Sequence, residues 1–138
     1  MALELESLKK AIGALERSLR VAGEHEGKED ADLQETLRAG VVQNFEVAYE
    51  QTWKMMKRWI ETNISPVEVD GVTRRQLFRI CHENRLIDQV DDWMAFHRAR
   101  NETSHTYDAE TAADVFAVAG AFLPAALEVF ARIAERND

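Results

Sequence analysis

Apolar side chains recur at helical spacing along most of the chain, and this pattern predicts an all-α protein. A first helix is expected over roughly 3–22, where apolar residues three and four positions apart form one stripe. That alternation is typical of helices that pack along one another at a shallow angle. The polar stretch 23–29 holds two glycines and no apolar residue, so it predicts a loop. A longer second helix is expected over about 32–61.

Turn signals separate this long helix from a short third one. Pro66 and an Asp-Gly pair at 70–71 lie in the connection 62–71, whose only alternating stretch, 67–69, is too short to found a sheet. Thr73 and Gln76 then fit a capping box, with the threonine as the cap. The third helix is therefore expected from about residue 74 to 84.

Aspartates mark the expected starts of the last two helices. Asp88 is expected to cap a helix that runs to about Asn101, and Asp108 to cap a final helix that continues almost to the end. Pro124 lies inside the last helix and predicts a kink there. The inner face of this helix is expected to carry Ala112, Val115, Phe116, Ala119, Phe122, Leu123, Leu127, Phe130 and Ile133.

These elements predict one domain over residues 1–138. Short connections favour antiparallel neighbours, so the expected architecture is an antiparallel up-and-down bundle of four main helices plus one short helix. A chain of 138 residues with 46% hydrophobic residues can bury a core without disulfides or a metal. The single cysteine, Cys81, lies in a helical stretch and is interpreted as a small buried apolar residue.

The charge balance restricts the possible partners. The sequence has 17 Lys and Arg against 25 Asp and Glu, which gives a net charge of −8. Phosphate contacts dominate non-specific nucleic-acid binding, so a broad, non-specific RNA surface is excluded and any RNA or nucleotide contact must be local. The first eight residues lack a basic start and an apolar run, and no long apolar stretch predicts a membrane span; we expect a cytoplasmic protein.

Polar residues with catalytic potential gather near the end of the fourth helix. Arg100, Asn101, His105 and Tyr107, which we call the motif surface, lie in a stretch with no apolar residue from 100 to 106. An arginine can clamp a phosphate and a histidine can transfer a proton near neutral pH, which is what metal-independent RNA cleavage needs. The alternative is that basic residues here only favour the helix dipole or cap its carbonyls.

Other candidate sites are weaker. His97 and His105 lack a recognised ligand spacing with nearby carboxylates, and no metal or cofactor is expected. On the second helix, Tyr49, Trp53 and Lys54 are candidates for binding a partner or a nucleotide. The two aromatic residues can equally belong to the core, to a dimer face or to a stacking platform.

The motif surface is similar to a known family. Arg100-x4-His105, extended by Tyr107, resembles the motif of HEPN domains, and the strings 42–54 and 100–112 resemble nucleotidyltransferase substrate-binding proteins. Leu123-Pro124 also matches. The similarity runs from about residue 41 to the end of the chain.

This resemblance implies a helical bundle that forms a homodimer and has a small nucleotidyltransferase as its partner. In related toxin–antitoxin pairs, the HEPN protein is a metal-independent ribonuclease and its partner adenylylates the motif tyrosine. Carried over, Arg100 would hold the scissile phosphate, Asn101 would orient the site, His105 would be the general acid or base, and Tyr107 would be modified. The family also has a non-catalytic interpretation, as a subunit that binds substrate for the nucleotidyltransferase. A structural helical bundle with an ordinary helix-end histidine is the third alternative.

Overall fold

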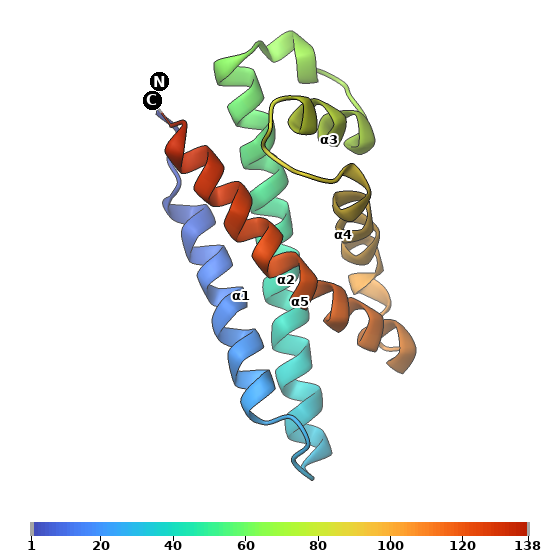
Figure 1. Cartoon of the computed structure of the whole chain (residues 1–138). Coiled ribbons are helices and arrows are strands. Elements are labelled where there is room, and N and C mark those ends of the chain that lie inside the picture. Colours follow the sequence, from blue (N-terminus) through green and yellow to red (C-terminus); the bar gives the residue numbers. More distant parts are fainter. Residues whose placement is uncertain (1, 138) are drawn as a thin grey trace.

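The computed structural model describes residues 2–137 and contains helices and no strands over that range. The described residues form five α-helices and two short 3-10 helices, and the α-helices are labelled in Figure 1. In chain order they are α1 (Glu6–Glu24), α2 (Ala31–Asn63), η1 (Pro66–Val69), α3 (Arg74–Glu83), α4 (Val90–Glu102), η2 (Thr103–His105) and α5 (Ala109–Glu135). This arrangement confirms the predicted all-α bundle, with element limits that differ from the expected ones by a few residues.

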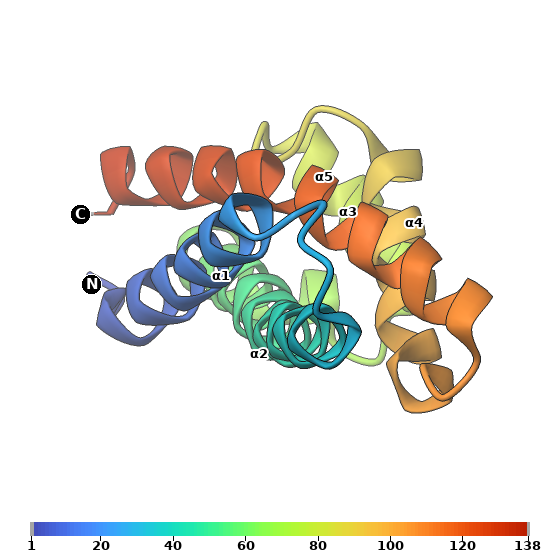
Figure 2. The same ribbon diagram turned by 90° about the horizontal axis from the view of Figure 1, so that it is seen from below.

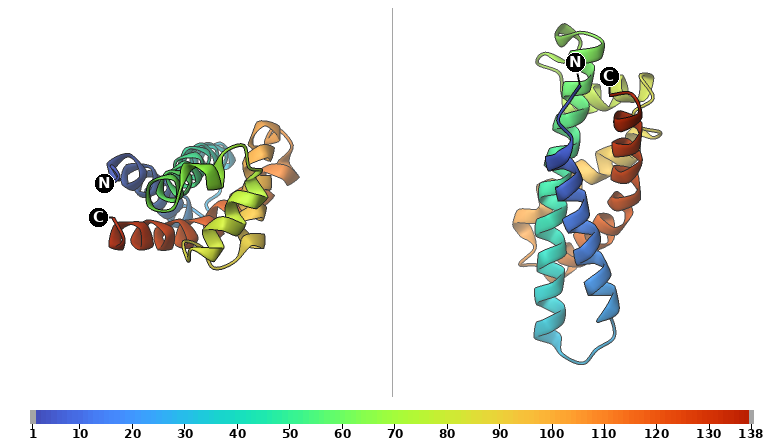
Figure 3. Two further views of the ribbon diagram at one scale, coloured as in Figure 1. Left: turned by 90° about the horizontal axis from the view of Figure 1, so that it is seen from above. Right: turned by 90° about the vertical axis from the view of Figure 1, so that its left-hand side faces the viewer.

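The two amino-terminal helices form a long antiparallel pair that supports the other elements. α2 packs along α1 and also contacts η1, α3, α4 and α5. α5 runs across this pair, while α3 and α4 lie on the side of α2 away from α1 (Figure 1; Figure 3). The two ends of the chain meet, because Leu3 N–H donates to Asn137 Oδ1 (2.7 Å) and Asn137 Nδ2 donates to the Leu3 carbonyl (3.0 Å).

An aromatic cluster centred on Phe122 forms the core between α2, α4 and α5. The Phe122 ring is fully buried and meets four other rings edge-on, with centroid distances of 5.2–6.2 Å: Phe45, Tyr49, Trp93 and Phe96. Edge-to-face pairs of this kind add to the stabilisation that burial of the rings provides. This cluster fixes the position of α4, and with it the motif surface.

The capping predictions are confirmed at two helices. Thr73 accepts from Gln76 N–H (3.2 Å) and the Gln76 side chain accepts from Thr73 N–H (2.8 Å), which is the expected capping box of α3. Asp108 accepts from Thr111 N–H (3.2 Å) and caps α5 as predicted. Asp30, which was not predicted, caps α2 through Leu33 N–H (3.0 Å).

Two predictions of the sequence analysis are wrong in the structure. Asp88 does not cap α4: the helix begins at Val90 after Gln89, and the Asp88 carboxylate instead accepts from Arg132 of α5 (2.7 Å). Leu127, placed on the inner face of α5, is 41% exposed. The turn of α5 that carries Leu127 is also close to Pro124, which removes one helical hydrogen bond and redirects the helix.

α5 combines length, apolar composition and a bend. It is continuous over 27 residues, and Figure 2 shows its axis changing direction part-way along, as Pro124 predicts. By length and composition alone it is also apolar enough to cross a membrane, with a mean hydropathy of 1.7 in its most apolar window. In this fold it packs against α1, α2 and α4 and supplies Phe122 to the core.

Candidate functional site

Hydroxyl side chains end α4 and shape the segment that carries the motif surface. Thr103 Oγ1 donates to the Arg100 carbonyl (2.8 Å), and Thr106 Oγ1 donates to the Thr103 carbonyl (3.2 Å). The chain then turns through η2, where Asp108 N–H bonds to the His105 carbonyl (3.2 Å), before α5 begins. These bonds satisfy carbonyls that a helix end leaves free and give the segment a defined shape.

Arg100 is anchored by carboxylates from α2. Its Nε lies 3.3 Å from Glu50 Oε1 and its Nη2 lies 3.5 Å from Glu46 Oε1, while Nη1 donates to Thr103 Oγ1 (3.2 Å). The Nε contact is an ion pair without hydrogen-bond geometry. The side chain is 29% exposed, so the guanidinium has a fixed orientation and still faces solvent along one edge. A cation held in this way is suited to bind an incoming phosphate in one geometry.

Asn101 lies one turn from a histidine that is itself bonded to the core. The Asn101 amide nitrogen is 3.5 Å from His97 Nε2, and His97 Nδ1 is 2.9 Å from the Tyr49 hydroxyl. Burial and the nearby Arg74 cation lower the pKa of His97 below its usual value of 6.5, so its ring is neutral at neutral pH. The sequence analysis considered His97 only as a metal ligand, and it could not connect the ring with Asn101 and Tyr49.

His105 and Tyr107 project from the segment between η2 and α5. Both are exposed, Tyr107 to 87%, and their ring centroids are 6.2 Å apart in an edge-on arrangement. Among residues 2–137, no hydrogen bond or ion pair joins His105 to Arg100. The structure thus brings the four residues to one end of α4, with His105 and Tyr107 beside each other and Arg100 turned towards α2.

A hollow of about 750 Å³ adjoins Tyr107. It lies between the first turns of α2 and the start of α5, with alanines and Val42 on its walls and Gln34, Glu35 and Arg38 at its polar positions. The Arg38 guanidinium lies 5.3 Å from the centroid of the Phe116 ring. The exposed hydroxyl of Tyr107 is therefore next to a surface depression rather than on a flat face.

The three candidates for partner or nucleotide binding have different positions. Tyr49 is fully buried, so its ring is part of the core and does not offer a stacking surface. Trp53 is half-buried, with its Nε1 donating to Glu50 Oε2 (3.1 Å), and Lys54 is exposed, 3.9 Å from the same carboxylate. Trp53 and Lys54 are therefore the two candidates that a partner can reach.

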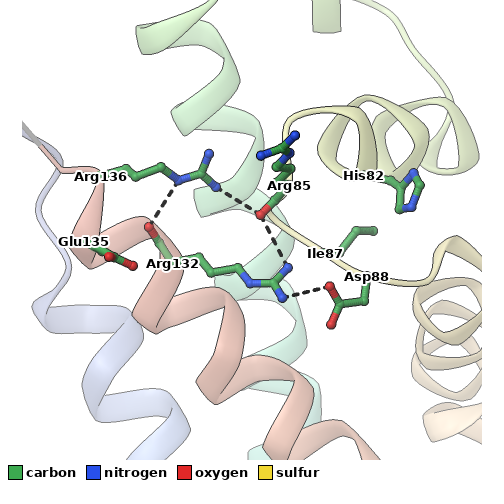
Figure 4. A pocket seen from close by; sticks show the side chains of 7 residues that line it. All are labelled: His82, Arg85, Ile87, Asp88, Arg132, Glu135 and Arg136. Atoms are coloured by element: carbon green, nitrogen blue, oxygen red, sulfur yellow. Dashed lines mark hydrogen bonds and ion pairs between the residues drawn. The ribbon is translucent and has the colours of Figure 1, made fainter.

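A second hollow lies away from the motif surface, beside the connection between α3 and α4 (Figure 4). Arg136 donates to the carbonyls of Asn84 (2.9 Å) and Arg85 (3.1 Å), and Arg132 donates to Asp88. These bonds tie the carboxyl end of α5 to a turn in which Arg85 has a positive φ of 62°. Arg132 and Arg136 in this hollow thus have a structural role, because they hold the turn between α3 and α4 against α5.

Cys81 is fully buried, as predicted, and burial raises the pKa of its thiol to about 12. A thiol in this environment stays protonated and is not a nucleophile at neutral pH. In the part of the chain that the structure describes, no three His, Cys, Asp or Glu side chains are grouped to hold a metal ion. The motif surface is thus the candidate site that the geometry supports.

Comparison with known proteins shows the family of the chain. A family model described as "Nucleotidyltransferase substrate binding protein like" matches residues 3–135. The chain belongs to this family. A Haemophilus influenzae protein named probable ribonuclease HepT is 35% identical over 107 residues, which cover 77% of this chain and 73% of that protein. The resemblance to HEPN-type proteins in the sequence analysis is therefore confirmed.

Solved structures agree with this family assignment. A Haemophilus influenzae structure described as the substrate-binding domain of a nucleotidyltransferase superposes with a TM-score of 0.89 and 30% identity, covering 95% of this chain and 99% of that one. A Thermus thermophilus structure has the same fold with a TM-score of 0.65 at 21% identity, covering 86% of this chain and 98% of that one. The family model spans residues 3–135, so the family fold includes α1, which precedes the stretch on which the sequence resemblance rests.

Proposed function

We propose that this protein is a metal-independent endoribonuclease toxin whose activity a small nucleotidyltransferase suppresses by adenylylating Tyr107. The observation that carries the proposal is the clustering of a fixed arginine, an exposed histidine and an exposed tyrosine at one end of α4. The relative named probable ribonuclease HepT supports the choice of reaction.

The chemistry needs a proton acceptor, a proton donor and a cation. A base removes the proton of the ribose 2′-hydroxyl, whose oxygen then forms a bond to phosphorus. The bond from phosphorus to the 5′-oxygen breaks, and an acid protonates this leaving oxygen. Arg100 binds the phosphate oxygens and stabilises the negative charge that develops on them, and His105 supplies one of the two proton transfers. Asn101 adds a hydrogen bond that orients the phosphate.

One copy of the motif surface provides a single exposed histidine, so the site is completed in a homodimer. Two copies that face each other place two His105 rings on one phosphate, one as base and the other as acid. A C2 interface brings the same surface of both protomers together and therefore pairs the motifs automatically. The protein acts in the cytoplasm, where RNA and the nucleotidyltransferase are both available.

Cleavage of a labelled RNA in EDTA tests this proposal. The wild-type protein is expected to cut the RNA, and His105→Ala to cut it about 10²-fold more slowly or worse, because it lacks the proton-transfer group. His105 is exposed, so the variant is expected to unfold at the same temperature as the wild type. His82→Ala is the matched control, since His82 is an exposed histidine on α3 and should cut normally. Equal rates for His105→Ala and the wild type would reject the assignment.

Adenylylation of Tyr107 would inactivate the site electrostatically and sterically. The transfer joins the tyrosine oxygen to the α-phosphorus of ATP, releases pyrophosphate and leaves a negative phosphodiester close to His105. Because the two rings are already 6.2 Å apart, the added group would compete with RNA for the motif surface. The hollow beside Tyr107 offers space for the adenosine.

Tyr107→Phe should remove the regulation by adenylylation and leave RNA cleavage intact. The phenylalanine variant is expected to cleave RNA at the wild-type rate, because the tyrosine hydroxyl takes no part in the chemistry. Incubation with the cognate nucleotidyltransferase and ATP should add mass to the wild type and stop its cleavage, and should leave Tyr107→Phe unchanged on both counts. A variant that gains the same mass would place the modification elsewhere.

The second candidate is a non-catalytic subunit that binds substrate for the nucleotidyltransferase. The pairing of Arg100 with Glu46 and Glu50, together with the net charge of −8, favours it, because both weaken attraction for RNA. The description of the Haemophilus influenzae structure as a substrate-binding domain agrees with it. It predicts no cleavage by unmodified protein, with stable co-purification of the nucleotidyltransferase.

A further inference from the structure

Four polar side chains from three helices form a connected row that ends at the motif surface. Arg74 of α3 donates from Nη1 to the Tyr49 hydroxyl of α2 (3.2 Å). This hydroxyl is 2.9 Å from Nδ1 of His97 on α4, and Nε2 of the same ring is 3.5 Å from the side-chain amide of Asn101. The row crosses the interface between α2 and α4: Tyr49 is fully buried, Arg74 and His97 are partly buried, and Asn101 is exposed.

The chemistry of the four groups gives the row one direction. A guanidinium has donors and no acceptor, so Arg74 must donate to the Tyr49 oxygen. The Tyr49 hydroxyl proton then needs an acceptor, and within residues 2–137 the only one bonded to it is His97 Nδ1. His97 is neutral, so with Nδ1 accepting, its proton is on Nε2, which faces Asn101. Burial also raises the pKa of Tyr49 to about 12, so the hydroxyl keeps its proton.

The same direction decides how the amide of Asn101 is turned. A protonated Nε2 needs an acceptor, so the carbonyl oxygen of Asn101 faces the ring and the amide nitrogen faces outward. The oxygen and nitrogen of an amide are assigned from such bonds, and the opposite orientation would leave the buried Tyr49 proton without a partner. In this orientation the two N–H donors of Asn101 point away from the protein, where a phosphate oxygen would bind.

We propose that Arg74, Tyr49 and His97 are positioning residues, which act in a row to hold Asn101 with its N–H donors towards the substrate. The inference rests on the proposed ribonuclease function for what Asn101 binds, but the direction of the row does not depend on that function. His97 acts through Asn101 and does not touch the RNA.

Arg74, the first residue of the row, is held in place through Trp53 by Glu50, the same carboxylate that orients Arg100. The Arg74 guanidinium lies 3.5 Å from the centroid of the Trp53 ring, and Trp53 Nε1 donates to Glu50, which pairs with Arg100 through its other oxygen. Two of the four residues of the motif surface, Arg100 and Asn101, are thus oriented by contacts that begin on α2. A planar cation stacked on an indole loses little entropy when it also donates a hydrogen bond.

The tautomer of His97 is the first test, and it requires no RNA. In a long-range ¹H–¹⁵N correlation spectrum of the wild-type protein near neutral pH, His97 should have a protonated Nε2 and an unprotonated Nδ1. Tyr49→Phe removes only the hydroxyl and should shift the ring towards a mixture of tautomers and alter the side-chain amide signals of Asn101. A protonated Nδ1 in the wild type would overturn the proposal.

Thr52→Val is the matched control for Tyr49→Phe. Thr52 is a fully buried residue one turn further along α2, and within residues 2–137 its hydroxyl bonds only to the Ala48 carbonyl (2.7 Å). Thr52→Val therefore removes a core hydroxyl outside the row and should leave the His97 and Asn101 signals as in the wild type. If Thr52→Val and Tyr49→Phe gave the same spectral change, loss of core packing would explain it, and the proposed positioning of Asn101 through Tyr49 and His97 would be rejected.

Kinetics then test positioning in a protein that cuts RNA. Tyr49→Phe should lower kcat about tenfold with KM within about twofold, since a donor fixed for the transition state affects kcat. His97→Gln offers an acceptor and a donor, as the expected tautomer does, so it should retain more kcat than His97→Ala. Unchanged kcat in Tyr49→Phe would overturn positioning. If the wild type cut no RNA, the proposed function would fail, while the His97 tautomer and Asn101 signals would still decide the row.

Discussion

Arg100→Ala is expected to lower the rate of RNA cleavage about 10³-fold, which is the size of effect that removal of one preorganised charge-stabilising donor produces. The loss should appear in kcat/KM with a large share in kcat, because the negative charge on the phosphate grows as the new bond to phosphorus forms. In the folded protein, the substitution also leaves Glu46 and Glu50 without their common partner. These two carboxylates would then repel the RNA that Arg100 had attracted.

Two variants separate the role of this side chain from general charge. Arg98→Ala removes an exposed cation from the same helix two residues earlier, and within residues 2–137 Arg98 has no ion-pair partner, so cleavage should stay within about twofold of the wild type. Arg100→Lys keeps the charge but loses the planar fork, and it should fall between the wild type and Arg100→Ala. A folded Arg100→Ala variant with a normal cleavage rate would contradict the phosphate-binding role.

The helices were predictable because their signals are local. The apolar spacing of α1 and α2, the capping box at Thr73 and the cap at Asp108 each depend on residues within one or two turns of each other. The prediction at Asp88 failed for the opposite reason. A short acidic residue before a helix favours capping locally, but Arg132, 44 positions away, binds the carboxylate in the folded chain.

The motif surface was predictable as a set of residues, but its internal organisation was not. Arg100, Asn101, His105 and Tyr107 are close in sequence, so their clustering needs no tertiary information. The carboxylates that orient Arg100 come from α2, and the bond that supports His97 beside Asn101 joins it to Tyr49, 48 positions away. A tyrosine at helical spacing on an aromatic stripe looks the same in sequence whether its hydroxyl reaches solvent or a buried histidine. The structure shows that Tyr49 is a buried core residue whose hydroxyl bonds to His97, and not a residue that a partner can reach.

Phe122→Ala is expected to destabilise the protein by about 3–5 kcal/mol, the usual cost of deleting a buried phenylalanine ring. The Phe122 ring is fully buried, with edge-on contacts to Phe45, Tyr49, Trp93 and Phe96 at centroid distances of 5.2–6.2 Å. Alanine would leave a cavity where α2, α4 and α5 meet, and three helices cannot all move to fill it. Urea denaturation followed by circular dichroism measures the loss.

Leu127→Ala provides the comparison on the same helix. Leu127 is 41% exposed, and its truncation should cost less than about 1 kcal/mol. Phe122 also contacts Tyr49, so a cavity at Phe122 loosens the support of His97 and Asn101 as well as the core. Under conditions where Phe122→Ala is still folded, its RNA cleavage should fall by more than that of Leu127→Ala. A destabilisation of Phe122→Ala below about 1 kcal/mol would mean that the ring cluster does not determine the position of α4.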